Sequence, residues 1–87
     1  MREDDLTDAE LAAIEERCAA ATPGPWKSFV EGRDHDSGDS FIQTPCDDDI
    51  YLTGTTIADQ DFIAHARVDV VRLLQEVRRQ RTGWGTE

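Results

Sequence analysis

The stretch Thr56 to Arg81, TIADQDFIAHARVDVVRLLQEVRRQR, carries the longest continuous helical pattern in the chain and decides the fold. Apolar residues recur along it at the spacing of one helix face, at Phe62, Ala66, Val70, Leu73 and Val77. This face is predicted to pack on the core. Thr56 and Asp59 resemble a capping box at the start of the helix, and Gly83 and Gly85 are expected just past its end.

A second, shorter apolar stripe lies on the opposite side of the same predicted helix and consists of Ala64, Val68 and Val71. Because one face is enough to build a core, this second stripe is predicted to contact another chain, most simply in a two-fold homodimer. The alternative is that these side chains are isolated exposed residues, or part of a wider core face. Trp84, in the sequence TGWG, is a further candidate interface residue, because an aromatic side chain can anchor in a partner's pocket.

The length and composition indicate one α+β domain spanning residues 1–87, with residues 1–5 and 82–87 expected to be flexible. No apolar run is long enough to cross a bilayer, and the acidic start differs from the basic and then apolar start of a secretory signal. A cytoplasmic location without a membrane partner is therefore expected. Cys18 and Cys46 lack metal-ligand or redox spacing and are predicted to be reduced thiols.

The net charge of −10 is concentrated in the front and middle of the chain. Such a charge opposes direct binding to nucleic acid and to anionic membranes, because both would repel the chain. It leaves a protein partner with a basic surface possible. No direct nucleic-acid binding is therefore expected.

The remaining elements follow from local signals. Thr7 and Glu10 form a capping box that begins a first helix, and Pro23 ends this helix near Ala21. The segment TPGPW, residues 22–26, is a rigid corner that leads into short strands. Three such strands are predicted, at Trp26–Val30, Phe41–Thr44 and Ile50–Thr53. The predicted fold is an N-terminal helix, a three-stranded antiparallel meander, and a long C-terminal helix packed on the sheet.

Two segments carry a resemblance: TPGPW at residues 22–26 and ADQDFIAHAR at residues 58–67. With them, the chain resembles a group of small uncharacterised proteins of actinobacteria and their phages. It is more distantly similar to the Ead-like proteins of the lambdoid phage early region. The resemblance implies a phage or mobile-element accessory domain without an assigned activity, and it carries over no catalytic residues.

The candidate chemical sites are few. Asp34, Asp36 and Asp39 lie in a loop and could offer oxygen ligands to a divalent cation. The twelfth position counted from Asp34 is Pro45, where an EF-hand needs a glutamate, so a solvated turn is the competing interpretation. His65 has an aspartate four residues away on each side, which is also typical of an exposed helix flank. No catalytic residues and no cofactor are predicted.

These observations favour a small acidic, non-enzymatic interaction domain that self-associates and is of phage or mobile-element accessory type. One alternative is that the acidic surface of residues 31–49 imitates nucleic acid and occupies a basic partner protein. Another is a divalent-metal-binding or enzymatic domain that uses the Asp and His residues of the loop.

Overall fold

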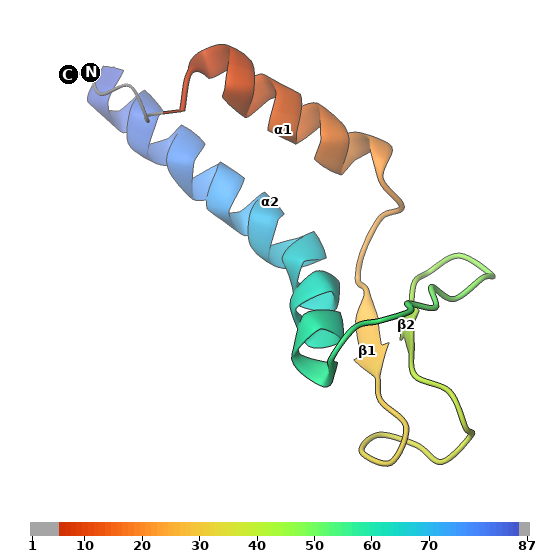
Figure 1. Ribbon diagram of the computed structural model, residues 1–87. Coiled ribbons are helices and arrows are strands. Elements are labelled where there is room, and N and C mark those ends of the chain that lie inside the picture. The colour runs from red at the N-terminus through yellow and green to blue at the C-terminus, as the bar shows by residue number, and fades with distance from the viewer. Residues whose placement is uncertain (1–5, 86–87) are drawn as a thin grey trace.

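The computed structural model describes residues 6–85, and describes side chains only up to residue 81. The chain is α+β, as predicted, and its elements follow in the expected order (Figure 1). They are helix α1 (Asp8–Ala20), strand β1 (Lys27–Phe29), strand β2 (Phe41–Gln43) and helix α2 (Ile57–Gly85). Of the ends predicted to be flexible, residues 1–5 and 86–87 lie outside the described residues, whereas positions 82–85 belong to α2.

The capping box of α1 is confirmed. The hydroxyl of Thr7 accepts a hydrogen bond from the backbone N–H of Glu10 at 3.0 Å, and the Glu10 carboxylate accepts from the Thr7 N–H at 2.8 Å. These two bonds satisfy N–H groups that the first helical turn cannot pair internally. The helix ends at Ala20, as the proline at position 23 predicts, and Ala21 has extended backbone geometry.

The sheet has two antiparallel strands, with Ser28 opposite Ile42. The third strand, predicted over Ile50–Thr53, is wrong. Ile50 exchanges two backbone hydrogen bonds with Ile42, at 2.9 and 2.8 Å, but no further residue of that segment pairs with the sheet. Residues 51–53 add no further bridge, and Gly54 then turns the chain towards α2 with a φ of 80°, outside the strand region.

The start of α2 is also as predicted. The side chains and backbone N–H groups of Thr56 and Asp59 exchange hydrogen bonds of 3.0 and 3.1 Å. The predicted end near Arg81 is wrong, because the helix continues through Gly83 to Gly85. Each glycine lowers helix stability by only about 1 kcal/mol and no proline follows, so nothing in the local sequence stops the helix there.

The core is small and lies on an unexpected side of α2. Its buried apolar residues are Leu11, Val30, Ile42, Ala64 and Leu74. The stripe of Phe62 and Leu73 was expected to be buried, and this prediction is wrong, because the two residues are 74% and 65% exposed. The short side chain of Ala64, which is 2% exposed, instead occupies the buried side of the helix, where a small residue permits close packing.

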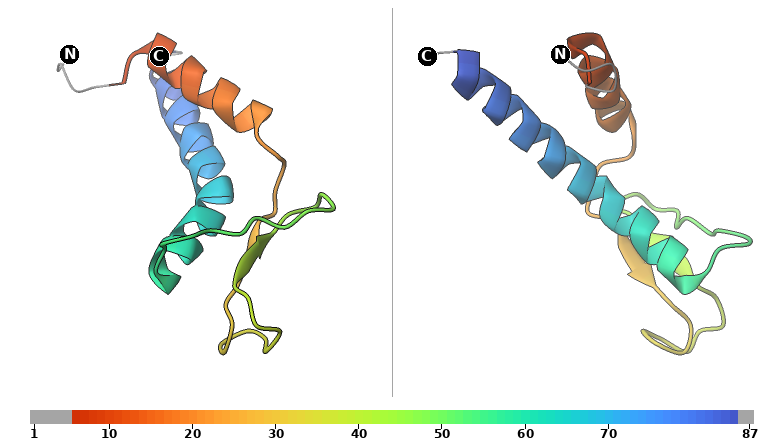
Figure 2. Two further views of the ribbon diagram at one scale, coloured as in Figure 1. Left: turned by 45° about the vertical axis from the view of Figure 1, so that its right-hand side comes forward. Right: turned by 60° about the vertical axis from the view of Figure 1, so that its left-hand side comes forward.

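The molecule is elongated. Its radius of gyration is 16.7 Å, whereas a compact domain of this length has about 12 Å. Helix α1 runs beside the C-terminal half of α2 and the strands lie beside its N-terminal half, as the views of Figures 1 and 2 agree. Both pack against the same side of α2. Within residues 6–85, no helix is long and apolar enough to span a membrane.

Candidate interaction surface

Arg67 of α2 joins the two segments of the TPGPW and FIAHAR pattern. Its Nε donates to the backbone carbonyl of Thr22 at 2.8 Å, and a terminal nitrogen donates to the carbonyl of Cys18 at 3.1 Å. The indole nitrogen of Trp26 donates to the same Thr22 carbonyl at 3.1 Å. The arginine therefore satisfies carbonyl groups at the end of α1 that lack a partner within the helix.

Gly24, in the centre of the corner, lies against the same arginine. A Cβ atom at this position would be 3.4 Å from Cγ of Arg67 and 3.8 Å from a methyl group of Val68. The corner and α2 are thus close enough that a larger residue would press on both side chains. The two sequence segments therefore form a single packing unit.

Gln60 is a functional core residue that the sequence analysis missed. It is only 4% exposed, and its amide nitrogen lies 2.9 Å from the hydroxyl of Ser28 and 3.2 Å from the carbonyls of both Phe29 and Phe41. It therefore ties α2 to both strands. The spacing offers a signal for this position, because Gln60 lies four residues before Ala64 and therefore on the same helix face. The polar side chain of Gln60 interrupts the apolar pattern of that face.

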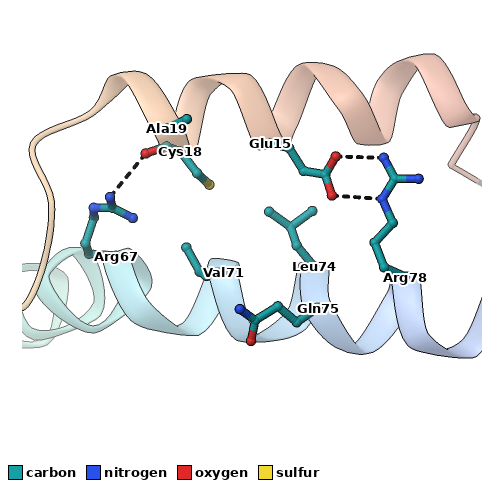
Figure 3. Close-up of a pocket in the computed structure, with 8 residues that line it drawn as sticks. All are labelled: Glu15, Cys18, Ala19, Arg67, Val71, Leu74, Gln75 and Arg78. Carbon is teal, nitrogen blue, oxygen red and sulfur yellow. Dashed lines mark hydrogen bonds and ion pairs between the residues drawn. The ribbon is translucent and has the colours of Figure 1, made fainter.

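A groove of about 470 Å³ lies between α1 and α2 (Figure 3). Val71, Leu74 and Cys18 line it, and a two-pronged ion pair of Arg78 with Glu15, at 2.7 and 2.9 Å, closes one end. The hydrogen bonds from Arg78 hold the pKa of Glu15 below its usual value. That carboxylate is thus kept charged in its ion pair, and Val71, Leu74 and Cys18 give the groove an apolar lining.

The acidic loop does not assemble a metal site. Asp34 accepts a hydrogen bond from the Val30 N–H and pairs with Arg33, each at 2.8 Å, and Arg33 also pairs with Asp61 at 2.7 Å. The hydrogen bonds from Arg33 lower the pKa of both carboxylates, that of Asp61 to about 2. Among the described residues, no three potential ligands come together. Asp34 therefore stabilises the loop through its contacts with Val30 and Arg33, and Asp36 is exposed.

The two histidines occupy different surroundings. His35 packs beside Phe41, with ring centroids 5.2 Å apart, and its Nδ1 lies 2.6 Å from the Ser37 hydroxyl. Its Nε2 is buried and has no hydrogen-bond partner within the described part of the chain. His65 is exposed on α2, and the neighbouring Asp61 turns to Arg33. The Asp61 carboxylate therefore pairs with Arg33 and not with His65, although the two residues are four positions apart.

The residues of the predicted interface do not form one exposed patch. Ala64 is 2% exposed and belongs to the core of its own chain, and Val71 faces the groove against α1. Val68 is 43% exposed. The side chain of Trp84 lies outside the described residues. Of Ala64, Val68 and Val71, only Val68 is exposed and could contact a second chain in this conformation.

The two most exposed large apolar side chains, Phe62 and Leu73, lie instead on the stripe that is predicted to be the core, whereas Ala66, Val70 and Val77 of this stripe are half-buried. We call it the outer stripe, and it comprises Phe62, Ala66, Val70, Leu73 and Val77. Two hollows adjoin it. One, of about 380 Å³, includes Ala66, Val70 and Trp26, and the other, of about 290 Å³, lies around Val77 and Gln80. Phe62 and Leu73 project from the same helix face.

The chain matches no family model, no curated protein and no solved structure. The surface must therefore be interpreted from its own geometry and chemistry.

Proposed function

We propose that this chain is a small acidic, non-enzymatic interaction domain that self-associates, of the phage or mobile-element accessory type that its resemblance implies. The observation that carries the proposal is the outer stripe, where Phe62 is 74% and Leu73 65% exposed. Ala66, Val70 and Val77 lie on the same helix face and are half-buried, so the stripe is apolar along its length. Contiguous apolar surface of this kind marks contact sites.

The test is the mass in solution, measured by light scattering and sedimentation over a range of concentrations at low and high salt. We expect a dimer that persists at high salt, because apolar burial provides most of its free energy and salt does not screen it. A monomer at concentrations of hundreds of micromolar would refute self-association.

An alternative function is supported by the charge of the middle segment. Residues 31–49 contain seven acidic residues and one arginine, and several of these carboxylates are exposed. Such a surface fits a partner protein with a basic face. Replacing Asp47, Asp48 and Asp49 by asparagine should weaken binding to a lysine-rich peptide more, per charge, than Glu16→Gln on α1. Equal losses per charge, or binding that is insensitive to salt, would contradict this alternative.

A further inference from the structure

The residues of the outer stripe are complementary to the same stripe on a second copy of the chain. We propose that two copies of the chain pair through α2 in an antiparallel, two-fold arrangement, with the axis passing between positions 70 and 71. This inference rests on the proposed self-association and specifies its surface, orientation and register. The predicted contact through Ala64 and Val71 is replaced, because those side chains face the chain's own core and groove.

The shape of the outer stripe fits this register. Antiparallel pairing about that axis places Phe62 opposite position 79 of the second copy, over the hollow around Val77 and Gln80. The same operation places Leu73 level with position 68 along the helix axis, but the side chain at position 68 lies on the other face of α2. Leu73 therefore faces the hollow that includes Ala66 and Val70. Each large exposed side chain therefore meets a hollow, which is the knob-into-hole contact that stabilises paired helices. In a parallel pair, Phe62 would instead face Phe62.

The charges beside the stripe are complementary in the same register. Asp69 comes opposite Arg72 of the second copy, and position 65 comes opposite position 76. The two-fold axis repeats each pair, because an isologous contact presents the same patch twice. Parallel pairing would place Asp69 beside Asp69 and Glu76 beside Glu76, and like charges at such positions repel.

The overall charge distribution also favours the antiparallel orientation. Most of the acidic hairpin residues lie near the N-terminal end of α2, since the sheet packs there (Figures 1 and 2). Residues 57–81 of the helix alone extend about 37 Å, so antiparallel pairing keeps the two hairpins several Debye lengths apart. Parallel pairing would bring them together. The opposite side of α2 is already covered by α1 and the sheet, whereas Phe62 and Leu73 of the outer stripe remain accessible.

Substitutions on the two faces test which face is used. Phe62→Asp should raise the dimer dissociation constant by about a hundredfold or more, because two copies of a phenylalanine lose their burial. Val68→Asp, on the face that the sequence predicted, should leave the constant nearly unchanged. Circular dichroism checks that both variants fold. The reverse result would overturn the inference.

Charge reversal tests the register. Asp69→Arg and Arg72→Asp should each weaken the dimer by roughly tenfold, because each change converts two attractive pairs into repulsive ones. The variant that carries both changes should recover the original affinity. If the double variant is weaker than either single variant, the proposed pairing is wrong.

Cross-linking tests the orientation in the full chain, with Cys18 and Cys46 replaced by serine. His65→Cys and Glu76→Cys each place one thiol on the flank. In the antiparallel dimer, identical positions are separated along the axis by eleven residues, about 16 Å. A shorter bismaleimide should therefore join an equimolar mixture of the two variants and neither variant alone.

The outcomes separate the inference from the proposed function. Cross-linking of each variant with itself, in a protein that is dimeric by light scattering, would overturn the antiparallel orientation and leave self-association intact. A dimer that gives no cross-link in any sample would overturn the outer stripe as the interface. A monomer under all conditions would overturn the proposed self-association itself.

Discussion

Replacing Arg67 by alanine should destabilise the fold more than any other change at a charged residue of α2. The guanidinium donates to the carbonyls of Thr22 and Cys18, at 2.8 and 3.1 Å, in a partly buried position. A hydrogen bond that involves a charged group contributes about 1.5–3 kcal/mol, and partial burial places these two near the lower limit. We expect the free energy of unfolding to fall by about 2–4 kcal/mol. A chain of this length has only about 4–13 kcal/mol in total.

The measurement is urea denaturation followed by far-ultraviolet circular dichroism. It is carried out in the Phe62→Asp background, so that association does not contribute to the unfolding free energy. Arg67→Lys should lower the free energy of unfolding by about half as much as Arg67→Ala, because an ammonium cannot donate to two separated carbonyls with the geometry of a guanidinium. The matched control is Arg79→Ala, whose side chain is 70% exposed on the same helix. If Arg67→Ala and Arg79→Ala have equal effects, Arg67 does not join α1 to α2.

Three further substitutions test contacts elsewhere in the fold. Gln60→Leu should lower the free energy of unfolding by about 2–3 kcal/mol, measured with urea, because it leaves hydrogen-bond acceptors on the strands without a donor. The hydrogen bond from Arg33 lowers the pKa of Asp61 from 3.8 to about 2. The contribution of the Asp61 carboxylate to the free energy of unfolding is therefore complete above pH 4 and is lost as the pH falls through 2. Between pH 4 and pH 2, the urea midpoint of the Asp61→Asn variant should therefore fall less than that of the unchanged protein. Arg78→Ala removes an exposed ion pair with Glu15 and should have a much smaller effect than Arg67→Ala, decreasing further at high salt in the same assay.

The features that the sequence predicted correctly are those that depend on neighbouring residues. The capping boxes at Thr7 and Thr56 each need only a hydroxyl and a carboxylate three residues apart, and both form. The end of α1 follows from the proline at position 23 in the same way. Such signals act within one turn of helix, so they do not depend on how the elements pack.

The buried face of α2 could not be predicted from periodicity, because the helix carries two apolar stripes. The larger side chains, Phe62 and Leu73, made one stripe resemble a core face. The true core side contains Gln60 and Arg67, which are polar and therefore looked exposed. Gln60 is buried and Arg67 is half-buried, and both positions depend on backbone acceptors supplied by the strands and by the end of α1. These acceptors are brought there by tertiary packing, which a single helix pattern does not encode.

The exposure of the outer stripe is a consequence of specific polar contacts. Arg67, Arg78 and Arg81 hold α1 against α2, through carbonyls and carboxylates of α1 and the turn that precedes it. Gln60 fixes the sheet on the same side. Neither layer can rotate over Phe62 without breaking these bonds, and loss of the partly buried bonds of Arg67 and Gln60 would leave polar groups without a partner. A chain that only needed a monomeric core could have turned its largest apolar side chains inward. The contacts that hold the fold together instead keep these side chains accessible, which is the arrangement that an association surface requires.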